Sequence, residues 1–383
     1  MNLSISAGKP RIYRIAVSAF FFISGLTFAT WASRIPDIKT QLQLSNARLG
    51  AVLFALPAGL MTSLLFAGWL VSRYGSRKVM IAAAIFYPAI LVLLGLSASV
   101  WQLAFVLFLF GLGSNLVNIA MNTQAVDVES MYGRSVMASF HGLWSIAGFS
   151  GAATGTLLVS AGVAPWMHFL IIFVTAVLLV SFFYKFTLPA DTVTSEKQPF
   201  FVKPDRFILN LGLIAFCSML CEGAMADWSG VYFQNIVKAP TAFITLGYVA
   251  FTAAMATGRF LGDSMVTKLG IKKLLQLSAT FISTGLFISI LFPYMVTSVI
   301  GFLLVGLGVS SVVPLIYSQA GKSGTMQPGL ALAAVSSISF LGFLIGPPLI
   351  GFVAEAAGLR LSFAVIAVIG MLPAILASKI KEQ

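Results

Sequence analysis

Apolar residues in this chain come in long runs that are separated by short polar stretches. Each run is long enough for a helix that crosses the hydrocarbon core of a bilayer, which takes about 20 residues. The runs are continuous and do not alternate strictly between apolar and polar positions, which indicates helices and not the strands of a membrane barrel. The pattern therefore predicts an all-α membrane protein whose twelve transmembrane helices lie at 12–34, 45–71, 78–98, 101–126, 135–160, 164–186, 206–231, 241–266, 272–294, 296–320, 328–355 and 359–379.

The composition excludes a soluble globular protein. Hydrophobic residues make up 59% of the 383 positions and charged residues only 9%, whereas a soluble domain carries roughly a quarter charged residues. The outer surface of the folded chain must therefore meet lipid.

The basic residues report the orientation of the chain. The net charge is +12, but most lysines and arginines fall in loops and ends on one side of the predicted helices, as expected for the cytoplasmic side. We therefore predict a multi-pass protein of the bacterial inner membrane with both termini in the cytoplasm, and no nucleic-acid partner. The basic start and first apolar run resemble a signal peptide, but the run is long enough to span, so we expect it to remain as the first helix.

The chain divides into two similar parts around a polar segment. Residues 187–205 are rich in proline and charge, which predicts a cytoplasmic linker between a six-helix bundle at 1–186 and a second at 206–383. The end of the second predicted helix, 68–78, resembles that of the eighth, 263–273. Repeated halves of this kind are typical of secondary transporters, which bind substrate between them.

The segment after the second predicted helix resembles the inner-loop signature of the major facilitator superfamily, Gly-x-x-x-Asp-Arg-x-Gly-Arg-Arg/Lys. The chain keeps the residues Gly68, Arg73, Gly75, Arg77 and Lys78. It departs from the signature at the aspartate, which is Ser72 in the first copy and Thr267 in the second. The resemblance implies two pseudo-symmetric bundles, a monomer, and a gating role for Arg73 and Arg77, although the missing aspartates put the usual inner latch in doubt.

Four further motifs are similar to a MosC-like subgroup near the fucose permeases. They are residues 31–37, the pair Asn118 and Asn122, residues 140–142, and residues 222–228. This resemblance implies a sugar-like or inositol-like substrate.

Polar side chains inside predicted spans are candidates for a substrate site because they are costly in lipid. Asn115, Asn118 and Asn122 fall within about 60° on one helix face, and amides can bind hydroxyl-rich solutes. Hydrogen bonds between helices are the alternative explanation. The other candidate ligands are His141 and Trp144, Tyr317 in the second half, and the matching tryptophans Trp31 and Trp228.

The acidic residues of the seventh predicted helix are the candidates for proton coupling. Glu222 and Asp227 lie inside the span, where a low dielectric favours the protonated carboxyl group. We expect Asp227 to pair with Arg34 as an outer gate, Glu222 to face the cavity, and Arg259 to pair with Asp263 one turn away. Static ion pairs are the alternative.

The sequence thus predicts a secondary transporter that moves a small polar solute such as a sugar, polyol or inositol-like compound, with protons and without a cofactor or metal. An exporter of drugs or amphipathic metabolites is the alternative, because Gly342, Gly346 and Pro347 resemble an exporter motif. An enzyme is not expected, since the chain has no phosphate-binding Gly-x4-Gly-Lys-Ser/Thr loop.

Overall fold

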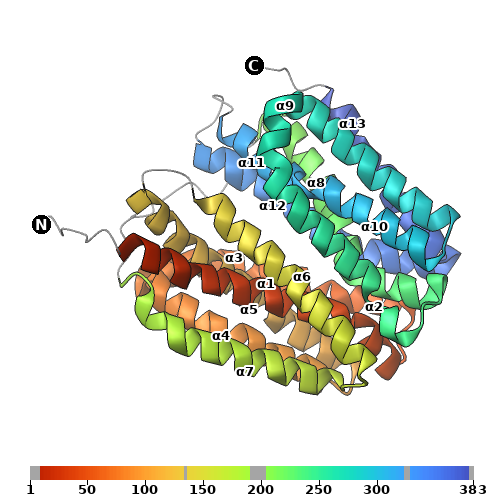
Figure 1. Cartoon of the computed structure of the whole chain (residues 1–383), viewed down its shortest axis with the longest axis horizontal. Helices are drawn as coiled ribbons and strands as arrows, with labels where there is room; N and C mark the ends of the chain where they lie inside the picture. The colour runs from red at the N-terminus through yellow and green to blue at the C-terminus, as the bar shows by residue number, and fades with distance from the viewer. Residues whose placement is uncertain (1–8, 133–135, 190–203, 323–327, 379–383) are drawn as a thin grey trace, which may run out of the picture. The chain divides into compact units, whose positions relative to one another are not determined.

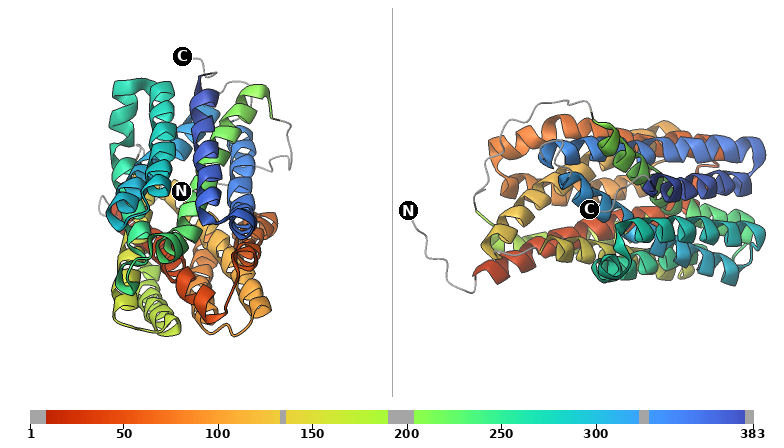
Figure 2. Two further views of the ribbon diagram at one scale, coloured as in Figure 1. Left: turned by 90° about the vertical axis from the view of Figure 1, so that its right-hand side faces the viewer. Right: turned by 90° about the horizontal axis from the view of Figure 1, so that it is seen from above.

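The computed structural model describes residues 9–132, 136–189, 204–322 and 328–378. Every element drawn as a ribbon is a helix (Figures 1 and 2). The elements are α1 (Lys9–Gln41), α2 (Asn46–Leu53), α3 (Ala55–Tyr74), α4 (Ser76–Gly95), α5 (Val100–Tyr132), α6 (Met137–Ser160), α7 (Pro165–Phe183), η1 (Tyr184–Phe186), α8 (Arg206–Tyr232), η2 (Phe233–Val237), η3 (Thr241–Phe243), α9 (Leu246–Leu291), α10 (Met295–Ser310), α11 (Val312–Gly321), α12 (Pro328–Ala357) and α13 (Leu359–Ala377).

Twelve helical segments in the described residues are long and apolar enough to cross a membrane. The helices and the membrane spans do not correspond one to one. The second span combines α2 with α3, and α9 holds two spans that turn back at Gly270, whose φ of 74° lies in the left-handed region that favours glycine (Figure 1). The predicted all-α membrane fold is therefore confirmed.

Helix α7 shows how the outside of the protein meets lipid. Apolar side chains at every fourth position along one of its faces are exposed: Trp166, Leu170, Val174, Leu178 and Phe182. A continuous apolar stripe of this kind would be costly in water. The lipid bilayer is its natural solvent.

The chain forms two compact units. Unit 1 comprises Met1–Trp31, Ala55–Leu158 and Gly162–Glu196, and unit 2 comprises Ala32–Phe54, Val159–Ala161 and Lys197–Gln383. The hairpin 32–54, which consists of the end of α1 and all of α2, therefore belongs to unit 2. Most of the predicted linker, 190–203, lies outside the described residues, and the division into 1–186 and 206–383 remains a prediction.

Close contacts between backbones hold the helices of each unit together. In unit 1, Gly59 of α3 faces the carbonyl oxygen of Phe108, and Gly111 of α5 faces that of Leu56. In unit 2, Gly306 of α10 faces the carbonyl oxygen of Phe251 in α9. A side chain at any of these glycines would force the two helices apart, so small residues set the helix separation.

Candidate transport site

The predicted asparagine stripe on α5 divides into two parts. Asn115 is 2% exposed, and its side-chain NH2 group donates a 2.6 Å hydrogen bond to the hydroxyl of Ser63 in α3. Asn118 and Asn122 are partly exposed, and the amide of Asn122 donates to the Asn118 side-chain oxygen at 2.9 Å. Asn115 thus joins two helices, whereas substrate binding by Asn118 and Asn122 remains a prediction.

Gln124, which was not among the predicted ligands, has a structural role in unit 1. Its side-chain NH2 group donates to the Ser76 hydroxyl at 2.7 Å and to the Leu188 carbonyl at 3.2 Å, and its oxygen accepts the Leu188 N–H at 2.9 Å. All of these atoms are buried. Gln124 therefore fixes the chain that follows α7 against α4 and α5.

The two basic residues of the inner-loop signature have different surroundings. Arg77 donates a 3.0 Å hydrogen bond to the carbonyl oxygen of Tyr184, just after α7. Arg73 lies over the rings of Trp69 and Tyr74, at 5.7 and 5.8 Å from their centroids. Of these two residues, only Arg77 forms a hydrogen bond to another part of unit 1 among the described residues. A gating role for either residue remains a prediction.

The predicted aromatic ligands differ in accessibility. His141 is exposed and meets Phe21 edge-on at 5.4 Å, and Trp144 is partly buried beside Phe28. Trp31 and Trp228 are 1% and 0% exposed, and neither indole N–H has a hydrogen-bond partner among the described residues. A ligand cannot reach these two tryptophans in this conformation, which argues against the predicted contact.

Tyr317 lies on α11 and is partly buried. Its side chain packs against an apolar cluster of unit 2 that includes Ile208, Leu211 and Ile316. This packing gives the residue a structural contact, and a role in substrate binding remains a prediction.

Glu222 of α8 faces Arg259 of α9. A carboxylate oxygen of Glu222 lies 3.8 Å from a guanidinium nitrogen of Arg259, and the side chains are 14% and 19% exposed. The distance exceeds the 2.7–2.9 Å of a short charge-assisted hydrogen bond, so the attraction is mainly coulombic. The predicted partner of Arg259 was Asp263, whose side chain lies outside the described residues; the ion pair that the structure shows is with Glu222, on a different helix.

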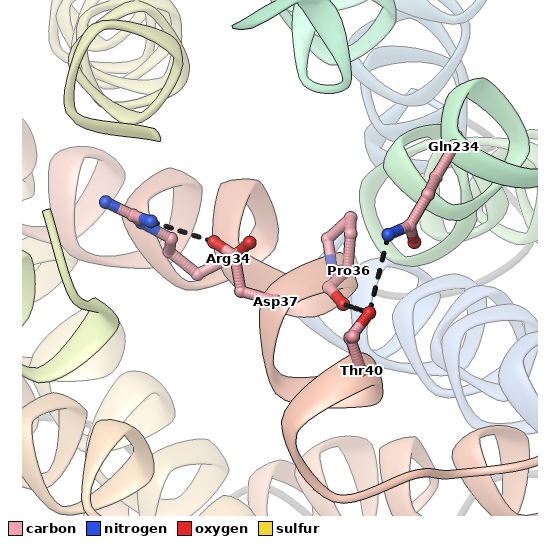
Figure 3. A network of polar contacts seen from close by, with 5 residues as sticks. All are labelled: Arg34, Pro36, Asp37, Thr40 and Gln234. Atoms are coloured by element: carbon pink, nitrogen blue, oxygen red, sulfur yellow. Dashed lines mark hydrogen bonds and ion pairs between the residues drawn. The ribbon is translucent and has the colours of Figure 1, made fainter. Parts of the chain in front are cut away.

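Asp227 lies five residues further along α8. It makes no hydrogen bond or ion pair with any residue that the structure describes, although it is inside a membrane span. Figure 3 shows why the predicted partner, Arg34, is not available: its guanidinium bonds the carboxylate of Asp37 at 2.8 Å and points away from the helix that carries Gln234. The predicted Arg34–Asp227 pair is therefore not among the ion pairs of the described residues, in which Arg34 pairs with Asp37.

One face of α8 packs against the end of α1. A side-chain carbon added to Gly230 would lie 2.6 Å from Cγ of Pro36, and the amide of Gln234 donates to the Thr40 hydroxyl at 3.4 Å (Figure 3). Asp227 precedes Gly230 and Gln234 by three and seven residues, spacings that place all three on one helix face. Asp227 thus lies one turn from the α1–α8 contact, on the side away from Gln234.

Comparison with known proteins identifies the family of this protein. The described residues form a multi-pass helical membrane protein with charged and amide groups inside its spans, which are the features of a transporter. The sequence profile of the Major Facilitator Superfamily matches residues 17–327. The chain belongs to this family of transporters.

Several relatives extend over almost the whole chain. An uncharacterized MFS-type transporter of Yersinia pestis is 33% identical over 93% of this chain and 92% of its own. The membrane protein MosC of Rhizobium meliloti is 31% identical over 94% of this chain and 88% of its own. A cis,cis-muconate transport protein of Acinetobacter baylyi is 23% identical over 94% of this chain and 92% of its own.

Solved structures of transporters share the fold. A D-xylose-proton symporter, 14% identical, covers 96% of this chain and 98% of its own with a TM-score of 0.76. A single-residue mutant of the nucleoside transporter NupG, also 14% identical, covers 96% of this chain and 99% of its own with the same TM-score. At this identity the likeness concerns the fold alone.

Proposed function

We propose that this protein is a proton-coupled transporter of the bacterial inner membrane that carries a small polar solute of the sugar, polyol or inositol-like class. Both termini lie in the cytoplasm, in accord with the distribution of lysine and arginine. Substrate and proton cross by alternating access of a site within the membrane.

The Glu222–Arg259 pair is the observation that carries proton coupling. Both groups lie within membrane spans, and the long 3.8 Å contact leaves the carboxylate bound mainly by coulombic attraction. Protonation of Glu222 neutralises the carboxylate and removes that attraction. The pair thus has two states that differ by one proton, and each state favours a different arrangement of α8 and α9.

The amide pair on α5 supports the substrate class. The side chains of Asn118 and Asn122 are partly exposed and bond one another, so a hydroxyl group that replaces this bond can donate to one amide and accept from the other. The exposed His141 and the partly buried Trp144 lie on α6 of the same unit. Neutral, hydroxyl-rich solutes fit these groups.

The test is internal pH in proteoliposomes that contain purified protein. Addition of a sugar or polyol pool to the outside should acidify the lumen, because the proton enters with the solute. Glu222→Gln should abolish acidification and keep exchange of solute across the membrane in counterflow, since exchange requires no net proton movement. Acidification that persists in Glu222→Gln would contradict the role of Glu222.

The same assay distinguishes an exporter from the proposed symporter. That alternative is favoured by Pro347, which lies inside α12 after the two glycines of the exporter-like motif. An exporter that exchanges amphipathic cations for protons would alkalinise the lumen when such cations are added, and polyols would have no effect.

The asparagines offer a matched set of variants on one helix. Asn115→Ala should lower the thermal stability of the purified protein, because it leaves the buried hydroxyl of Ser63 without its donor and costs about 1–3 kcal/mol. Asn118→Ala and Asn122→Ala should keep the stability and reduce substrate affinity about tenfold, which transport at varied solute concentration would measure. Equal losses of affinity in all three variants would contradict the separation of roles.

A further inference from the structure

The apolar stripe of α7, which runs from Trp166 to Phe182, ends beside a cation. Lys185 follows in η1, and its ammonium lies over the rings of Phe182 and Phe186, 5.9 and 5.1 Å from their centroids. The face of an aromatic ring attracts a cation at this distance, so the two rings keep the charge at the end of the stripe. The Lys185 side chain is exposed, and a ligand can therefore reach it.

A second cation meets the same end of α7 from α4. The two helices lie side by side in unit 1 (Figure 1). The Arg77 guanidinium donates its 3.0 Å hydrogen bond to the carbonyl oxygen of Tyr184, the residue before Lys185. A guanidinium carries five N–H donors in a planar fork, so this bond fixes Arg77 and leaves donors for a further acceptor.

No carboxylate neutralises these two cations from within the elements that carry them. The helices α4, α7 and η1 contain no aspartate or glutamate, and neither Arg77 nor Lys185 forms an ion pair in the described part of the chain. The neighbouring surface is apolar, since Leu178 and Phe182 are 66% and 59% exposed. Charge and surface together fit an anion that also has an apolar part.

We propose that Arg77 and Lys185 bind the phosphate of an anionic phospholipid whose acyl chains lie along the apolar stripe of α7. The phosphate oxygens accept from the Lys185 ammonium and from the remaining N–H groups of Arg77. At 1.5 Å per residue, Leu178 and Val174 lie about 6 and 12 Å deeper in the bilayer than Phe182, beside the chains.

Two features select this ligand. A zwitterionic headgroup would bring its own cation toward two cations that have no carboxylate beside them, so a lipid with net negative charge is favoured. A soluble phosphate compound would gain the charge contact without the apolar one. The site faces lipid, and it is independent of the proposed solute and of proton coupling.

Native mass spectrometry of the purified protein in detergent counts bound lipid. Phosphatidylglycerol is added to one sample, and phosphatidylcholine with the same acyl chains to another. The wild type should bind its first phosphatidylglycerol about three- to tenfold more tightly, in accord with the attraction of one basic side chain for an anionic lipid. Glycerol 3-phosphate carries the charge without the chains and should not displace the lipid; displacement at equal concentration would indicate a site for soluble phosphate compounds instead.

Variants at exposed lysines separate the outcomes. Lys185→Gln should lower phosphatidylglycerol binding to the level of phosphatidylcholine, whereas Lys185→Arg keeps the cation and should keep the preference. Lys322→Gln is the matched control, because Lys322 is also an exposed lysine at the end of a helix, α11, but belongs to unit 2. Size-exclusion chromatography checks that each variant is folded.

Three results would overturn the site. They are equal binding of the two lipids by the wild type, an unchanged preference in Lys185→Gln, and an equal loss of preference in Lys322→Gln, which would indicate attraction by net charge alone. Arg77→Gln should also weaken the preference, and an unchanged preference in that variant would remove Arg77 from the site.

Discussion

Replacement of Arg259 by methionine is expected to reduce substrate transport by about 100-fold or more. The change leaves the Glu222 carboxylate inside a membrane span without the cation that lies 3.8 Å away. Removal of one partner of a buried ion pair costs about 3–5 kcal/mol, and the partial exposure of this pair places the cost at the lower end. Glu222 then keeps its proton throughout the cycle, so the proton is not released on the second side.

Initial rates of uptake in proteoliposomes measure this effect, with thermal unfolding of the purified protein alongside. Arg48→Met is the matched control, because Arg48 is exposed and forms no ion pair in the described residues. The double variant Glu222→Gln with Arg259→Met should regain much of the lost stability, since no unpaired charge remains, but not proton-coupled uptake. Wild-type uptake in Arg259→Met would exclude the pair from the transport cycle.

The number and kind of helices could be predicted from the sequence because lipid leaves few choices. A span must satisfy its backbone hydrogen bonds internally and must be apolar over about 20 residues, so the spans are visible as runs of hydrophobic residues. The ends were less well predicted. Helix α1 continues to Gln41, seven residues beyond the predicted end at Arg34.

The continuation of α1 has a local cause that hydropathy does not report. Arg34 and Asp37 form an ion pair three residues apart, and the Thr40 hydroxyl donates to the carbonyl oxygen of Pro36 at 2.9 Å. Polar residues can thus extend a helix beyond the apolar run. In the described residues Arg34 pairs with Asp37 and not with the predicted partner Asp227.

Contacts between helices could not be predicted from spacing along one helix. The three asparagines of α5 share a face, but Ser63, which accepts from Asn115, is 52 residues away in the chain. Arg259 forms an ion pair with Glu222, which lies on another helix, α8. Which residues pair across helices depends on which helices are neighbours. The spacing of residues along one helix does not contain that information.

The sequence also does not say which glycines touch a backbone. Gly59 and Gly68 both lie on α3. A carbon added to Gly59 would overlap the carbonyl oxygen of Phe108, whereas one added to Gly68 meets nothing within 4 Å. The two positions therefore predict opposite results for the same substitution.

Gly59→Val is expected to destabilise the protein by about 1–3 kcal/mol, the usual cost of overpacking. The overlap is with backbone atoms of Phe108 and Leu112, which cannot move aside by a change of rotamer, so α3 and α5 must separate. This separation also weakens the 2.6 Å bond between Asn115 and Ser63, one turn further along α3. The midpoint of thermal unfolding in detergent, followed by size-exclusion chromatography, should fall by several degrees, and Gly59→Ala should show a smaller decrease.

Gly68→Ala is the control on the same helix. It should leave the midpoint unchanged or raise it slightly, because alanine favours a helix over glycine by about 1 kcal/mol and the position is open. A decrease in Gly68→Ala equal to that in Gly59→Ala would show that α3 requires glycine for its own conformation. A decrease confined to Gly59 would show that the distance between α3 and α5 limits the stability of unit 1.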